Sequence, residues 1–348
     1  AEDGIRDDLV TGVQTCALPI YVVQKDVSGE VITEVTFDMR QYFRSAIEDY
    51  LELSGKTLTK AASPFAPRLD AKEHERLLQQ EGELAKHAAH LVMKLMYGAR
   101  MALPYLCVII SRLSSQISKW TADSDRRLHR VYCFLDGALD IKLTGSLSTA
   151  DRDCIKLVAW PDADLNGDYM DTKSTSGFFL ELVGADGRGM PLDWGAKKQG
   201  CTAVHTAEAE VVSLSTCVRN ALIPMQILLQ RILREPVECE VMEDNAAAIV
   251  AITKGYSPAM RHIPRTQRVS LGMLHEVFHE EPEEGEGRIG LKKANTDDHR
   301  GDAFTKELDP HKFHAAIEMI RMKLHDEGAD EKDKRGNVAD KKGKGNSE

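Results

Sequence analysis

The sequence lacks several features that would assign it to a simple class. Its seven cysteines include no CxxC pair, which argues against a disulfide framework or a zinc site and fits a reducing compartment. No apolar run approaches the length of a membrane-spanning helix. The net charge of −10 argues against binding nucleic acid through the overall field of the protein, but it leaves room for a local basic groove. We therefore expect a globular protein with no membrane partner.

The first 20 residues, AEDGIRDDLVTGVQTCALPI, match no targeting class. Four acidic residues against one arginine exclude a mitochondrial presequence, and the stretch ALPI is too short for the apolar part of a secretory signal. Residues 1–7 and 10–20 resemble the translation of a sequencing-library adapter, with a sample barcode between them. We therefore expect residues 1–20 to be an unstructured artefact that packs against nothing, and the natural chain to extend further on its N-terminal side.

The periodicity of the chain changes near residue 145. Alternation over residues 21–37 predicts a β-hairpin, and the apolar spacing that follows predicts several helices. After the change, strands and helices alternate. The length allows about two domains, so we expect a mainly helical segment over 21–150 and a mixed α/β layer over 151–310. The composition of 311–348 predicts a helix end and a disordered charged tail.

Acidic residues stand at the ends of several predicted elements of the α/β layer. They are Asp162 and Asp164 after the first strand, Glu208 and Glu210 in the first turns of the long helix, Asp244 between a later strand and helix, and Asp302 at the last short helix. Strand ends and adjoining helix starts of one sheet converge in space, so these acids can gather at one edge. Crowded carboxylates resist ionisation unless a cation holds them. Oxygen ligands favour Mg²⁺ or Mn²⁺, and two such ions about 4 Å apart support phosphodiester hydrolysis.

Each of these acids also has a structural interpretation. An Asp at a helix start is more often a cap than a catalyst, and Asp244 and Asp302 both suit that role. Glu208 could be surface charge. The compatible positions of the acids favour the metal site, and the structural interpretation stays open at this point.

Five motifs, in this order, resemble a known family. They are DADLNGDYMDTKSTSGFFLELVG, WGAKKQ, HTAEAEVVSLST, EDNAAAI and GDAFTK. Together they resemble the ribonuclease H domain of copia-type LTR-retrotransposon Pol polyproteins, over roughly residues 157–308. The segment before them resembles the part of those polyproteins that joins reverse transcriptase to ribonuclease H. The resemblance implies a ribonuclease H-like mixed five-stranded sheet flanked by helices, preceded by a mainly helical, thumb- or connection-like remnant of reverse transcriptase.

The resemblance also implies a site and a reaction. It assigns catalysis and metal binding to Asp162, Glu210, Asp244 and Asp302. It implies two Mg²⁺ (or Mn²⁺) ions and hydrolysis of the RNA strand of an RNA–DNA hybrid during reverse transcription. Two departures, Leu165 where the family has an aromatic residue and Val211 where it has Tyr, affect packing more than chemistry. Asp164 and Glu208 are then neighbours of the metal ligands.

A reverse-transcriptase palm carries a paired-Asp motif of the YxDD kind, and this sequence has none. A two-metal polymerase site needs such carboxylates, so we expect no DNA synthesis by this chain. The resemblance implies that the missing polymerase part of the same polyprotein is a partner. It also implies a cytoplasmic virus-like particle as the location, with a nuclear stage left open.

Basic residues at two places are candidates for contact with the hybrid, whose recognition relies on shape, phosphates and 2′-hydroxyls. The first group is Lys197, Lys198 and Gln199; the second is Arg261, His262, Arg265 and Arg268. A solvated face explains either group equally well. His299, three residues before Asp302, is a candidate for protonating the leaving group or releasing product, with a structural role as the alternative.

Two other functions stay open. The first is a decayed, catalytically inactive retroelement fragment that folds and at most binds nucleic acid. The second is another polynucleotidyl transferase with the same fold, such as an integrase. The helical segment upstream and the KKQ and FTK motifs favour ribonuclease H over an integrase.

Overall fold

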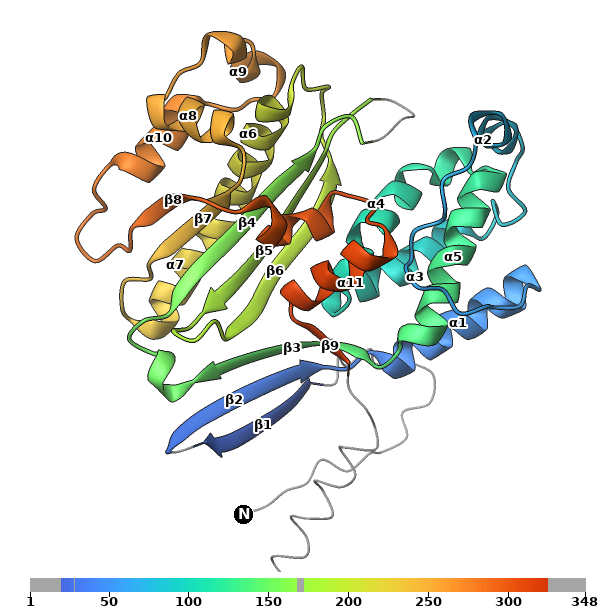
Figure 1. Ribbon diagram of the computed structural model, residues 1–348, viewed down its shortest axis with the longest axis horizontal. Helices are drawn as coiled ribbons and strands as arrows, with labels where there is room; N and C mark the ends of the chain where they lie inside the picture. The colour runs from blue at the N-terminus through green and yellow to red at the C-terminus, as the bar shows by residue number, and fades with distance from the viewer. Residues whose placement is uncertain (1–19, 28, 168–171, 325–348) are drawn as a thin grey trace, which may run out of the picture.

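The computed structural model describes residues 20–27, 29–167 and 172–324 (Figure 1). The predicted artefact over 1–19 and the predicted tail beyond 324 therefore lie outside the described residues. Ile20 already belongs to the first strand, where it pairs with Phe37. The prediction that residue 20 packs against nothing is therefore wrong, because the strand begins at the last residue of the adapter-like stretch.

Two β-sheets organise the chain. One has four antiparallel strands in the order β1-β2-β3-β9: β1 (Ile20–Val27), β2 (Glu30–Phe37), β3 (Ile141–Ser148) and β9 (Met322–Leu324). The other has the order β6-β5-β4-β7-β8: β4 (Lys156–Asp164), β5 (Thr175–Val183), β6 (Gly189–Lys198), β7 (Cys239–Glu243) and β8 (Ile289–Lys293). β4, β5 and β6 are antiparallel neighbours, whereas β4, β7 and β8 run parallel. The predicted mixed five-stranded sheet and the predicted N-terminal hairpin are confirmed.

Helices flank the five-stranded sheet, on both sides as Figure 1 shows. Before the sheet come α1 (Arg40–Ser54), α2 (Ala71–Leu78), α3 (Ala88–Met101), α4 (Cys107–Ser115) and α5 (Ala122–Ala138). Within and after it come α6 (Thr206–Cys217), α7 (Ile223–Leu233), α8 (Ala246–Lys254), α9 (Ile263–Thr266), α10 (Leu271–His279), the 3₁₀ helix η7 (Arg300–Phe304) and α11 (Pro310–Met319). Local sequence sets the helix ends: Gly55 ends α1 at φ 63°, and Thr121 begins α5 with a capping box.

Each side of the sheet has its own hydrophobic core. α6, α8 and α10 pack with β4 and β7 around residues such as Leu157, Leu214 and Ile252. On the other side, the helices α1, α3, α4, α5 and α11 share a core with Phe179 of β5 and Phe304 of η7. The segment that precedes the sheet is therefore a layer packed on it, and not a separate body.

The chain near its described end returns to the first segment. β9 pairs with β3 between Met322 and Leu143, and α11 places Phe313 in the core formed by the earlier helices. The sequence pattern predicted only a helix end here, and it predicted no strand over Ile141–Ser148. Both strands depend on pairing between residues far apart in the chain, which local periodicity does not show.

The long helix predicted on the sheet is present, and it is more apolar than we expected from the sequence. α6 and α7 join through a π-helical turn, Val218–Leu222, into one helix from Thr206 to Leu233. Its 28 residues have a window of mean hydropathy 1.3, enough by length and composition to cross a membrane. The expectation that no apolar run approaches the length of a membrane-spanning helix is therefore wrong. In the structure, 56% of that window is buried inside the protein, as expected of a core helix.

Candidate metal centre

The four predicted acids meet at one edge of the five-stranded sheet. Oxygen atoms of Asp162, Glu210 and Asp244 lie within 4.8 Å of one another. Ligand atoms of Asp162, His299 and Asp302 form a second group with the same spacing. Asp162 belongs to both groups, so it stands at the centre of the cluster.

The topology explains this convergence. β4 and β7 are parallel neighbours, with Ala159 opposite Val241, so their carboxyl ends bring Asp162 and Asp244 to the same edge. α6 crosses this edge because Ser213 donates its hydroxyl to the carbonyl of Asp162 at 2.6 Å. Glu210 lies three residues before Ser213 on the same helix, and it therefore faces the strand end.

η7 brings Asp302 against the strand through a close backbone approach. A Cβ added at Gly301 would lie 2.6 Å from the Cβ of Asp162 and 2.8 Å from the ring of His299. Only glycine leaves room for η7 at this distance. The motif GDAFTK thus has a packing reason for its first residue.

The electrostatics of the cluster favour a bound cation. Asp162 is 1% exposed and Glu210 4% exposed, and the Oε2 atom of Glu210 has no hydrogen-bond partner among the described residues. Burial raises the pKa of Glu210 to about 10, and the negative charge of Asp162 adds to the effect. Burial also raises the pKa of Asp302, again with Asp162 contributing. Buried carboxylates with an unsatisfied oxygen are suited to hold Mg²⁺ or Mn²⁺.

Two neighbouring side chains that the sequence reading missed contact this cluster. The hydroxyl of Thr305 donates to Oδ2 of Asp162, and Nζ of Lys306 donates to Oδ1 of Asp302. Nζ also lies 3.6 Å from Oδ1 of Asp162. Burial acts to lower the pKa of Lys306, but Asp162 and Asp302 outweigh it and raise the pKa above its usual value. The spacing of Asp302 and Lys306, four residues apart in GDAFTK, was the available signal.

The helix-cap interpretation of the acids is wrong. Asn245, not Asp244, is the N-cap of α8, because its side chain accepts hydrogen bonds from the backbone of Ala247 and Ala248 at 3.0 Å. Asp302 lies inside η7, where the N-cap position belongs to His299. Both acids are therefore available to the cluster.

Glu208 is not surface charge either. It is fully buried; Oε2 accepts from the backbone of Val204 at 2.9 Å, and Oε1 lies 3.1 Å from Nε2 of His262. These contacts hold the loop before α6, and they give His262 of the predicted basic group a partner within the protein. Both carboxylate oxygens of Glu208 thus have partners within the protein. The prediction that Glu208 is a neighbour of the metal ligands, and not a ligand itself, stays a prediction.

Glu243 is a further buried carboxylate that the sequence reading missed. It is fully buried in β7, where Oε1 accepts from the backbone of Asn245 at 3.0 Å and Oε2 has no partner among the described residues. Burial raises its pKa to about 8. Its position at the end of a predicted strand was the available signal, but an alternating strand does not reveal which face an acid takes.

His299 is buried, with 1% of its surface exposed. Its Nε2 donates to the carbonyl of Met242 at 3.0 Å, and its ring meets Trp160 edge to face at 5.7 Å. Nδ1 has no hydrogen-bond partner among the described residues. These contacts hold the ring beside Asp302; its role in proton transfer or product release remains a prediction.

The basic residues are placed less uniformly than predicted. Lys197 is exposed, and Lys198 half-buried, at the end of β6. Gln199 is only 5% exposed, and its amide donates to Ser176 and to the carbonyl of Ala209 at 2.9 Å each. These two bonds join β5 to α6 and use the amide donor of Gln199 within the protein, so contact between Gln199 and nucleic acid stays a prediction.

The second basic group surrounds α9. Arg261, Arg265 and Arg268 are exposed there, and Nε of Arg261 donates to the hydroxyl of Tyr256 at 2.8 Å. Exposure suits both a solvated face and phosphate contact, so substrate contact by these residues stays a prediction.

Comparison with known proteins relates the chain to retrotransposon Pol polyproteins. It is 26% identical over 167 residues to the Retrovirus-related Pol polyprotein from transposon TNT 1-94 of Nicotiana tabacum, covering 48% of this chain and 11% of that protein. It is 29% identical over 127 residues to the Secreted RxLR effector protein 161 of Plasmopara viticola, covering 36% of this chain and 83% of that protein. No family model matches the chain. The chain thus spans about a tenth of the length of the Pol polyprotein that it matches.

Proposed function

We propose that this chain is a metal-dependent ribonuclease H of retroelement origin, which hydrolyses the RNA strand of RNA–DNA hybrids. The observation that carries the proposal is the convergence of Asp162, Glu210, Asp244 and Asp302 at one sheet edge. The similarity to a retrotransposon Pol polyprotein supports the same reading. We infer accordingly that the five-stranded sheet is ribonuclease H-like.

The residues present fit two divalent cations. Asp162 is shared by the two ligand groups, with Glu210 and Asp244 on one side and Asp302 on the other. When bound, Mg²⁺ supplies an activated water and stabilises the charge that develops on the phosphate. Glu210 must release its proton to act as a ligand, since its pKa lies near 10 without metal.

The remaining side chains orient this site. Ser213 fixes the backbone of Asp162 against α6, and Thr305 fixes one of its carboxylate oxygens. His299 shares a ligand group with Asp302, and its Nδ1 has no hydrogen-bond partner among the described residues, which makes it a candidate to pass a proton to the departing oxygen. The exposed Lys197 and the arginines around α9 are candidates for contact with hybrid phosphates.

A labelled RNA–DNA hybrid incubated with the chain and Mg²⁺ tests the proposal. We expect cleavage of the RNA strand, no cleavage of duplex DNA, and no reaction in EDTA. Binding of the hybrid without cleavage would favour a decayed, inactive fragment. Joining of DNA strands would favour an integrase-like transferase.

A further inference from the structure

A buried arginine of the helical layer before the sheet contacts the segment beside the candidate metal centre. Arg112 of α4 has only 10% of its side chain exposed. Its Nη1 lies 2.6 Å from Oε1 of Glu307, and its Nη2 lies 3.4 Å from Oδ2 of Asp164. Nη2 also donates to the carbonyl of Thr305 at 3.4 Å. One guanidinium therefore holds Asp164 on β4 and two positions of the segment that follows η7.

The segment held by Arg112 is the one that touches the metal ligands. In residues 305–307, the side chain of Thr305 contacts Asp162, that of Lys306 contacts Asp302, and that of Glu307 turns to the helical layer. Fixing Glu307 and the carbonyl of Thr305 thus fixes the two side chains that orient the ligands.

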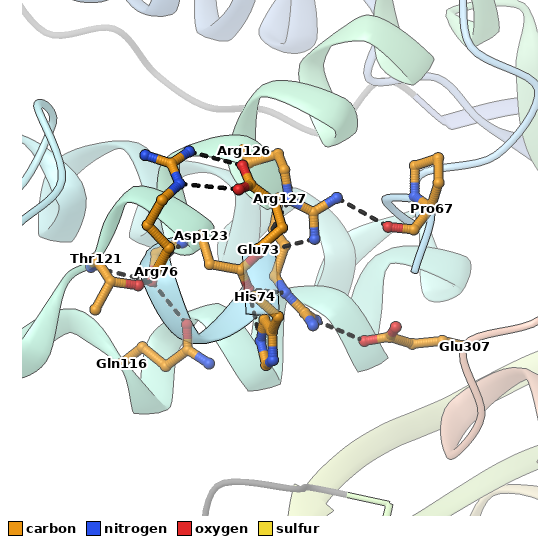
Figure 2. A network of polar contacts seen from close by, with 11 residues as sticks. Pro67, Glu73, His74, Arg76, Gln116, Thr121, Asp123, Arg126, Arg127 and Glu307 are labelled. Atoms are coloured by element: carbon orange, nitrogen blue, oxygen red, sulfur yellow. Dashed lines mark hydrogen bonds and ion pairs between the residues drawn. The ribbon is translucent and has the colours of Figure 1, made fainter. Parts of the chain in front are cut away.

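A second arginine anchors Glu307 to the same layer. Nη1 of Arg127, on α5, lies 2.9 Å from Oε1 of Glu307, and Nε lies 2.7 Å from Oδ2 of Asp123 (Figure 2). Arg126, the residue before Arg127, pairs with the same Asp123. Its other hydrogen bond goes to the carbonyl of Pro67 and not to Glu307. Arg126 therefore belongs to the network without touching Glu307, and it provides a matched control.

We propose that Arg112 is a positioning residue for the metal centre, through which the helical layer sets the geometry of the segment 305–307 and of Asp164. The inference rests on the proposed ribonuclease H function. A planar guanidinium can serve Glu307, Asp164 and a carbonyl at once, whereas a lysine ammonium is a single point charge. Arg112→Lys therefore keeps the charge and loses the bridge.

The test compares Arg112→Lys, Glu307→Gln and the control Arg126→Lys by two measurements. The first is the Mg²⁺ concentration that gives half-maximal cleavage of the hybrid. The second is the Mg²⁺ concentration that gives half of the metal-induced rise in melting temperature, which needs no activity. Mutation of a residue that supports the metal ligands typically lowers metal affinity or activity by about 10- to 100-fold. We expect an increase of that size in both midpoints for the first two variants and none for Arg126→Lys.

The outcomes separate the inference from the proposed function. Equal Mg²⁺ midpoints in Arg112→Lys, Glu307→Gln and the unaltered chain would overturn the inference, even if the melting temperature without metal falls. If the unaltered chain binds Mg²⁺ but never cleaves the hybrid, the proposed function fails, and the melting measurement still decides the role of Arg112. Glu307→Gln removes the charge that Arg112 and Arg127 share, at a less buried side chain than that of Arg112, so it serves if Arg112→Lys does not fold.

Discussion

Asp244 and Asn245 are adjacent in the sequence but serve different parts of the structure. The side chain of Asn245 accepts two backbone hydrogen bonds at 3.0 Å and begins α8, while an oxygen of Asp244 lies within 4.8 Å of ligand atoms of Asp162 and Glu210. The fold thus assigns the cap to the amide and leaves the carboxylate to the cluster. A change of charge at Asp244 is therefore separable from a change of helix stability.

The first prediction concerns stability in the absence of metal. Burial raises the pKa of Glu210 from 4.5 to about 10. Between these two pH values the folded chain holds a proton on Glu210, whereas the unfolded chain has released it. The contribution to the free energy of unfolding is fully present below pH 4.5 and is lost as the pH rises toward 10, by at most about 1.4 kcal/mol per pH unit for this one proton. Denaturation in EDTA at pH 6 to about 9 measures it.

The variant Glu210→Gln is the control for this effect, since glutamine does not titrate. We expect the free energy of unfolding of the unaltered chain, relative to that of the variant, to fall as the pH rises. A difference that stays constant over this range would show that Glu210 ionises in the folded chain as it does in water.

The second prediction concerns protons released by metal binding. Glu210 is protonated near pH 7 without metal, and a carboxylate must be ionised to bind Mg²⁺. We therefore expect Mg²⁺ binding to release protons and its affinity to rise from pH 6 to about 8. Titration calorimetry in buffers of different ionisation enthalpy measures the release. A heat of binding that is the same in every buffer would contradict this account of Glu210.

The third prediction concerns Lys306, whose ammonium group contacts Asp302 and lies near Asp162. Lys306→Met should lower the free energy of unfolding without metal by about 1 kcal/mol, a modest loss because solvent screens its partly exposed side chain. Mg²⁺ should then raise the melting temperature of the variant more than that of the unaltered chain. The exposed Lys292 offers a control, Lys292→Met, for which neither quantity should change.

The site was more predictable from the sequence than the layer around it. Asp162 and Asp244 end parallel strands, and Glu210 begins a helix on the same sheet, so the order of elements alone brings them together. Gln199 shows the limit of this reasoning. A polar residue at a strand end suits either solvent or a buried hydrogen bond, and only the packed structure shows that its amide serves Ser176.

Long-range pairing explains what the sequence did not show. β3 has the polar sequence IKLTGSLS and pairs with β2, whose Val35 lies opposite Gly145 more than a hundred residues away. Arg112 likewise pairs with Glu307, although all five strands of the larger sheet lie between these two residues in the sequence. Helical periodicity places an arginine on a helix, but it does not reveal a partner on a distant segment.

The measurement that tests the central claim most directly is cleavage of a labelled RNA–DNA hybrid by Asp244→Asn. The swap preserves shape and weakens a ligand for a hard cation, and Asn245→Ser, which keeps a good cap, is the matched control. We expect Asp244→Asn to fold with unchanged or slightly higher stability without metal and to cut no more than an enzyme-free sample, while Asn245→Ser cuts like the unaltered chain. Cleavage by Asp244→Asn at a rate near that of the unaltered chain would contradict the metal centre and the function proposed from it.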